Sequence, residues 1–181
     1  MSREIKINNP EGVYFLTFAT VGWVDVFTRK FYRDMLLDSF RYCQKKKTLV
    51  IYAWCIMSNH VHLIASAGNG NLSGILRDMK SFTSKKIMDA ICTEAESRRE
   101  WMMKIFRYYG KYNPNNEEFQ FWQQDNHPIE LITNKFIGQK LNYIHYNPVE
   151  AGIVEEPEHY LYSSARDYTG IKGLLDIVLI D

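Results

Sequence analysis

Apolar and polar positions along the chain follow two different periods, one typical of strands and one typical of helices. Several segments have the strand pattern. Residues Val13–Val21 are almost entirely aromatic or β-branched, which is typical of a buried strand. The apolar runs Leu49–Met57 and His60–Ser66 are separated by two turn-forming residues, which predicts a hairpin. Two weaker patterns predict one further strand within 119–132 and a short edge strand at 174–180.

Apolar residues three and four positions apart predict four helices. Thr28 is the expected N-cap of the first helix, and Asn71 or Ser73 of the second. Pro148 is expected to end the fourth helix, because proline disfavours helical geometry at the residue before it. The helices are expected at 28–47, about 71–91, 97–109 and 133–147, with a loop at 112–116 and a polar bend at 124–127.

The expected elements occur in the order strand, helix, strand, strand, helix, strand, followed by a further helix. This is the split βαβ, ferredoxin-like arrangement, an α+β fold whose antiparallel sheet is covered by helices. The length of 181 residues fits one domain, and no repeat or linker divides it. Many nucleic-acid-binding modules and unrelated enzymes share this layout, so the fold leaves the function open.

Composition excludes several classes of protein. With 46% apolar and 24% charged residues the chain is typical of a soluble globular protein rather than a disordered one. No apolar run approaches the roughly 20 residues of a membrane helix, and residues 1–6 lack the apolar core of a signal peptide. The three cysteines are odd in number and lack CxxC spacing, which indicates reduced thiols in a cytoplasmic protein.

The net charge of +1 averages segments of opposite sign. Residues 28–47 carry seven Lys or Arg against two Asp, and residues 77–87 carry four against one. Residues 150–181 reverse this, with seven acids against two basic residues, and form an acidic C-terminal extension. A basic part with an acidic tail permits a polyanionic partner, although charged helix faces are usually only solvated.

Candidate chemistry begins at His60-Val61-His62, the start of the second hairpin strand. Side chains on a strand alternate between faces, so His60 and His62 point the same way. Two imidazoles one pleat apart can share a divalent metal, but they can equally be ordinary histidines at a strand edge. A metal site needs a third ligand from elsewhere in the chain.

The helix expected at 133–147 offers such a ligand. At about 100° per residue, Phe136, Lys140, Tyr143 and Asn147 form one stripe about 60° wide beside the apolar stripe. Asn147 offers a carbonyl oxygen and Tyr143 a nucleophilic one, one turn apart. A free phenol has a pKa near 10, so a metal and a nearby Lys140 would assist its attack on a phosphate. Alternatively, Tyr143 only packs and Asn147 only ends the helix.

Two motifs in this order resemble the single-tyrosine HUH transposases, and among them the REP-associated tyrosine transposases. One is Met57-Ser58-Asn59-His60-Val61-His62, which carries the His-hydrophobic-His motif. The other is the segment 143–154, in which Tyr143 precedes an Asn-Pro-Val sequence by four residues. Trp122-Gln123 and the run Tyr162-Ser163-Ser164-Ala165 are also similar, so the resemblance spans roughly residues 13 to 168.

The resemblance implies an HUH-type fold and a DNA transposase, an endonuclease and strand transferase for single-stranded DNA. Tyr143 would attack a phosphodiester and form a 5′-phosphotyrosine. His60, His62 and Asn147 would bind Mg²⁺ or Mn²⁺. The substrate would be single-stranded or hairpin DNA, contacted by Lys80, Lys85, Lys86 and Lys140 on exposed helix faces. Some relatives are dimers that exchange the tyrosine helix, so a homodimer is possible, and bound protein would lie at the nucleoid.

Several alternatives stay open at this point. The chain could be a non-catalytic nucleic-acid-binding module of the same fold, or a metal-dependent phosphodiesterase without a covalent intermediate. Tyr146 is the rival nucleophile, but it lies off the stripe that Tyr143 shares with Asn147. His127 in the polar bend is either a further ligand, a DNA contact or a solvated loop residue. His145 points away from the stripe and is excluded from the metal site.

Overall fold

Four antiparallel strands form one sheet in the order β2-β3-β1-β4 in this computed structural model. The structure describes residues 7–113, 118–124 and 127–180. Residues 1–6, part of the loop expected at 112–116 and part of the bend expected at 124–127 lie outside these ranges. The strands are β1 (Tyr14–Ala19), β2 (Leu49–Ile56), β3 (His60–Ala67) and β4 (Ile129–Glu130).

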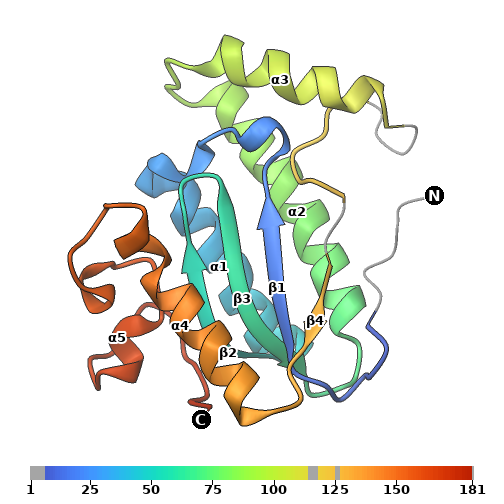
Figure 1. The fold of residues 1–181 in the computed structure, drawn as a ribbon. Helices are drawn as coiled ribbons and strands as arrows, with labels where there is room; N and C mark the ends of the chain where they lie inside the picture. The colour runs from blue at the N-terminus through green and yellow to red at the C-terminus, as the bar shows by residue number, and fades with distance from the viewer. Residues whose placement is uncertain (1–6, 114–117, 125–126, 181) are drawn as a thin grey trace.

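Helices cover the sheet unequally, and Figure 1 shows α1 and α2 behind it with α4 in front. Element order and sheet order together confirm the split βαβ, ferredoxin-like α+β fold. Among the described residues, no helix has both the length and the apolar character needed to cross a membrane. The helices are α1 (Lys30–Lys47), α2 (Leu72–Thr93), α3 (Arg99–Lys111), α4 (Asn134–Glu150) and α5 (Ala165–Tyr168), with short turns η1 (Val21–Trp23), η2 (Val26–Thr28) and η3 (Pro157–His159).

The register of β1 against β3 decides what surrounds the histidines. Thr17 pairs with His62, and Phe15 pairs with Ile64. Residues paired across an antiparallel ladder share a face, so Phe15 and Thr17 lie on the histidine face under α4. Phe18 lies on the opposite face, where its ring contacts Trp122.

The start of α1 differs from the expectation. Thr28 is not its N-cap, because the residue closes the short turn η2 and its hydroxyl donates to the carbonyl of Asp25. The helix begins one residue after Arg29, without a side-chain cap. The second helix follows its expected signal, since the Asn71 side chain accepts from the amide of Gly74.

Pro148 does not end α4, contrary to the sequence prediction. Proline removes only one hydrogen bond near the end of a helix, and the next residues close a C-terminal motif around Gly152, whose φ is 69°. The amide of Ile153 donates to the Pro148 carbonyl, and the Gly152 amide donates to the Val149 carbonyl. Asn147 therefore stays inside a regular turn, in helical register with Tyr143.

The acidic C-terminal segment packs along the open edge of β2. Backbone bonds join Ile56 to Tyr162 and Trp54 to Ser164, and Tyr160 and Tyr162 are both buried in the core. The edge strand predicted at 174–180 is wrong. This stretch makes a backbone bond from Val178 to Ile51 but forms no regular ladder.

Candidate active site at the histidine face

His60 and His62 lie side by side on β3, with ring centroids 4.7 Å apart. The His62 ring stacks on Phe15 at 5.6 Å, whereas His60 meets the edge of Trp23 at 6.1 Å. His62 is 3% exposed, so its position is fixed by packing on several sides. The alternation of side chains along the strand thus places both imidazoles where the sequence predicts them.

Hydrogen bonds orient both rings. The Nδ1 atom of His62 lies 2.9 Å from the Thr17 hydroxyl, and the Nδ1 atom of His60 lies 2.7 Å from Oδ1 of Asn59. The Asn59 amide nitrogen donates to the Trp23 carbonyl, so its Oδ1 must accept from His60. With the proton on Nδ1 of His60, the lone pair that could bind a metal is on Nε2.

Helix α4 brings its polar stripe against this pair. The Asn147 side-chain amide lies 3.5 Å from Nε2 of His62. The Asn147 side chain also forms a hydrogen bond with His60. Against the larger lowering by burial, this hydrogen bond raises the pKa of His60. Asn147 therefore spans both imidazoles, and turning the amide by 180° presents its carbonyl oxygen to the same space.

Tyr143 completes the group within one chain. Its ring centroid is 5.1 Å from His62 and 5.9 Å from Phe15, in edge-on contact with both, while 44% of the side chain stays exposed. The phenol is thus held beside the histidines but open to a large substrate. No exchange of helices between subunits is needed to bring these groups together. Tyr146 is 48% exposed, and the ring contacts to His62 belong to Tyr143.

The site is cationic at its rim and neutral at its centre. The Lys140 ammonium lies 4.5 Å from the Phe15 ring centroid and 5.6 Å from that of Tyr143. Burial lowers the pKa of His62 to about 3, helped by repulsion from His60 and Lys140. Burial also lowers the pKa of His60. Both imidazoles are therefore uncharged at neutral pH.

This donor set fits a divalent ion. Two neutral imidazoles and one amide oxygen supply three protein ligands and leave room for oxygens of a substrate. Among the described residues, no group of three His, Cys, Asp or Glu gathers to hold a metal. Asn147 is an uncharged oxygen donor that lies beside the two imidazoles.

A family comparison decides what kind of protein this is. Residues 13–113, more than half of the chain, match the family model described as IS200-like transposase. The chain belongs to this transposase family. The matched region contains both histidines but ends before α4. The placement of Tyr143 and Asn147 beside them thus comes from the structure.

One solved structure agrees with this assignment at the level of the fold. The REP-associated tyrosine transposase bound to a REP hairpin is similar to the whole chain, with a TM-score of 0.65 and 18% identity over 94% of that protein. A bacterial tRNA(His) guanylyltransferase-like protein in complex with GTP matches 81% of the chain, and 68% of that protein, with a TM-score of 0.43 and 9% identity. No curated protein sequence matches significantly.

The four lysines assigned to DNA lie in different places on the transposase. Lys140 is at the site itself. Lys85 and Lys86 are exposed on α2, on the other side of the sheet. Lys80 does not point outward as predicted, because its ammonium donates to the Gln123 carbonyl and lies 5.4 Å from the Phe18 ring centroid. Burial lowers its pKa to about 8.

Sequence reasoning missed the residues that orient the two histidines. Thr17, Phe15 and Asn59 orient the two imidazoles, and neither Thr17 nor Phe15 belongs to a recognisable motif. Asn59 adjoins His60 in the hairpin turn, which was an available signal. Thr17 and Phe15 become visible only with the register of β1 against β3. His127 is exposed, and His145 is turned away from the site, as expected.

His145 instead ties α4 to the C-terminal segment. Its Nε2 lies 2.9 Å from the Ser164 hydroxyl, which also bonds both backbone groups of Trp54. The ring packs against Tyr168 at 5.0 Å and is buried. This contact sets the rotation of α4 about its axis, and hence the direction in which Tyr143 and Asn147 point.

Acidification should destabilise the transposase through His145. Burial lowers its pKa from 6.5 to about 4, so between these values the unfolded chain binds more protons than the folded one. The free energy of unfolding therefore falls as the pH falls, by about 2 kcal/mol from pH 7 to pH 5 for this group. In urea unfolding, the change in the free energy of unfolding between pH 7 and pH 5 should be smaller in His145→Gln than in the wild type. Equal differences in the two proteins would contradict this.

Proposed function

We propose that this transposase cleaves and rejoins single-stranded DNA through a covalent bond to Tyr143. One observation carries the proposal: the exposed phenol of Tyr143 is held 5.1 Å, ring to ring, from the buried imidazole of His62, which lies beside His60 in the same chain. A tyrosine that only packs would be turned into the core. A non-catalytic module would not need two neutral imidazoles with oriented lone pairs. These features favour the covalent reaction over both alternatives.

The reaction is a transesterification at phosphorus. The Tyr143 oxygen forms a bond to the scissile phosphorus while the bond from phosphorus to the 3′ oxygen breaks. The phenolic proton is lost and the leaving 3′ oxygen gains one, so the products are a 5′-phosphotyrosine and a free 3′-hydroxyl. Attack by a 3′-hydroxyl reverses these steps and rejoins DNA. Lys140 would stabilise the developing phenolate and attract the phosphate.

We assign His60, His62 and Asn147 as ligands of Mg²⁺ or Mn²⁺. The oriented rings and the adjoining amide support this assignment, and imidazole nitrogen favours Mn²⁺ of the two. The ion would polarise the scissile phosphate as a Lewis acid. The residues themselves keep the site neutral before substrate binds and place the phosphate within reach of Tyr143.

Hairpin DNA is the substrate that we favour. The structural neighbour of the same fold is bound to a REP hairpin, and the Lys140 ammonium at the site would attract phosphates in a salt-dependent way. We assign the activity to one domain that includes the acidic segment, because Tyr160 and Tyr162 pack into the common core. Three unpaired cysteines support a cytoplasmic location with the chromosome. Since the site forms within one chain, a monomer suffices.

The direct test is a covalent adduct with the wild-type transposase. Hairpin oligonucleotides are taken from palindromic DNA beside its coding sequence and labelled at the 3′ end, since the enzyme would retain the 5′ phosphate of that fragment. With Mn²⁺ we expect a labelled protein band that survives denaturing electrophoresis, and with EDTA none. Binding without such a band would favour the non-catalytic module. Cleavage without it would favour the phosphodiesterase.

A further inference from the structure

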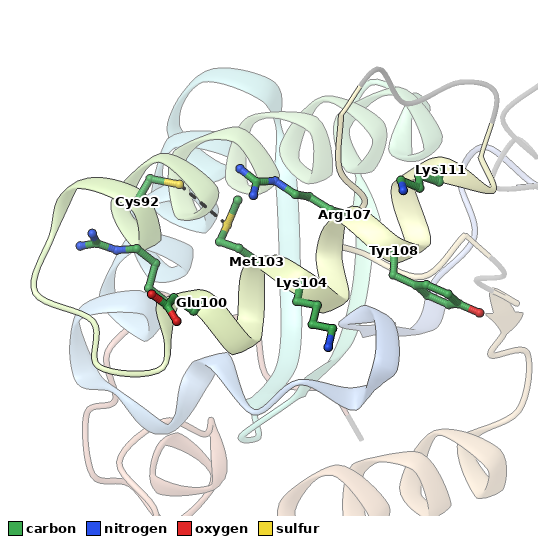
Figure 2. Close-up of a pocket in the computed structure, with 8 residues that line it drawn as sticks. Cys92, Glu100, Met103, Lys104, Arg107, Tyr108 and Lys111 are labelled. Atoms are coloured by element: carbon green, nitrogen blue, oxygen red, sulfur yellow. Dashed lines mark hydrogen bonds between the residues drawn. The ribbon is translucent and has the colours of Figure 1, made fainter.

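A groove of about 620 Å³ lies between the end of α2 and one side of α3, away from the histidine site. Figure 2 shows Cys92 and Met103 at one end, with Lys104, Arg107 and Lys111 along the α3 side. The proposed reaction does not use this groove. The basic residues of the groove and the tyrosine at its rim indicate which class of ligand it would bind.

The groove is strongly basic. It is lined by four Lys or Arg against the single carboxylate of Glu100. Arg99 is occupied with the last carbonyls of α2, and Arg107 has a long contact of 3.8 Å with Glu118. Lys104 and Lys111 are exposed and have no ion pair among the described residues. Seven residues of helix separate them by about 10 Å, roughly the rise of three stacked nucleotides.

Exposed tyrosines lie beside these cations. Tyr108 is 57% exposed, and its ring centroid is 5.1 Å from that of Tyr112 and 5.6 Å from that of Tyr109. Protein partners would usually cover such rings with apolar side chains, but the four basic residues that line the groove with Tyr108 favour an anion with aromatic faces. Cationic grooves with exposed aromatic rings are typical of single-stranded nucleic-acid binding, where phosphates meet lysines and bases stack on tyrosines.

Continuity with the catalytic site favours DNA as the occupant. Helix α3 packs on η1, where a Cβ at Gly22 would come within 2.9 Å of Ile105 and 3.3 Å of Tyr109. The next residue, Trp23, is 57% exposed, and its ring lies 6.1 Å from His60. A strand that leaves the histidines over Trp23 would therefore come to α3 (Figure 1).

We propose that the groove of Lys104, Arg107, Tyr108 and Lys111 binds single-stranded DNA that continues from the catalytic site. The proposal rests on the proposed function for the identity of the strand. The binding itself does not depend on the reaction: side chains of α3 would bind phosphates and stack on bases without taking part in cleavage. Binding there would hold the flanking strand in place while the covalent intermediate awaits the incoming 3′-hydroxyl.

The test measures binding of fluorescein-labelled dT20, which requires no cleavage. We compare Lys104→Gln/Lys111→Gln with the control Lys45→Gln/Lys46→Gln, which removes the same charge from exposed positions on α1. We expect the α3 variant to bind about tenfold more weakly by fluorescence anisotropy. Its slope of log affinity against log salt should be less negative by about 1.4, for two lost phosphate contacts. The control should stay within about twofold of the wild type.

Tyr108→Ala tests stacking separately and should weaken dT20 binding at least fivefold without changing the salt slope. Wild-type affinity in the α3 variant, equal losses in variant and control, or tenfold tighter binding of rU20 than dT20 would each overturn the proposal. Because the measurement is independent of the Tyr143 adduct, failure here and failure of the proposed reaction are distinguishable. Equal melting temperatures will show that the variants are folded.

Discussion

Tyr143→Phe should abolish the covalent protein–DNA adduct, with a loss of cleavage of at least about a thousandfold. The substitution removes one oxygen and keeps the ring that contacts His62 and Phe15 at 5.1 and 5.9 Å. The site should therefore keep its shape, and because 44% of the side chain is exposed the free energy of unfolding should change by less than about 1 kcal/mol. The measurement is the labelled band under the conditions used for the wild type, with a melting curve.

Tyr146→Phe is the matched control, since Tyr146 is on the same helix and 48% exposed. It should keep the adduct at wild-type level, because it lacks the ring contact with His62 that places Tyr143. An adduct lost in Tyr146→Phe and retained in Tyr143→Phe would transfer the role of nucleophile to Tyr146. An adduct retained in both single variants and lost in the double variant would mean that either tyrosine can attack.

Local periodicity predicted the parts of this site that depend on one element. A period of two put His60 and His62 on one face, and helical spacing aligned Tyr143 with Asn147. These relations are fixed by backbone geometry, whatever the rest of the chain does. The meeting of strand and helix was a hypothesis from donor chemistry that the family resemblance then strengthened, because no local pattern says that α4 crosses in front of β3.

The failed predictions have two physical causes. Some side chains interact with residues distant in sequence, and elsewhere a stronger local motif overrides the signal that was used. Lys80 was placed outward by helical phase, but its long stem lets the ammonium reach the Gln123 carbonyl past Phe18. Pro148 was expected to stop α4, but the turn at Gly152 sets the end of the helix instead. Thr17 was missed because strand register is not encoded in either strand alone.

His62→Ala should remove Mn²⁺ binding and metal-dependent cleavage, with activity lower by at least about a thousandfold. His62 lies between the Asn147 amide and the Thr17 hydroxyl, so the substitution removes one proposed metal ligand and leaves both of these side chains without their partner at His62. Titration calorimetry with Mn²⁺ should show no saturable site, and the EDTA-treated wild type should recover activity with Mn²⁺ while the variant does not. Full activity in the variant would exclude His62 as a ligand. Because this side chain is buried, a loss of folding could imitate the result.

Thr17→Val removes that ambiguity, because it changes the partner of the ligand and leaves both imidazoles in place. The Thr17 hydroxyl lies 2.9 Å from Nδ1 of His62, so it acts on the orientation of this ring. Loss of such a contact typically weakens metal affinity by about 10- to 100-fold. We therefore expect a folded protein whose activity at low Mn²⁺ falls by that factor and is restored by raising Mn²⁺, which damage to the DNA-binding surface could not produce. An activity loss that excess Mn²⁺ does not repair would mean that Thr17 supports the fold rather than the metal site.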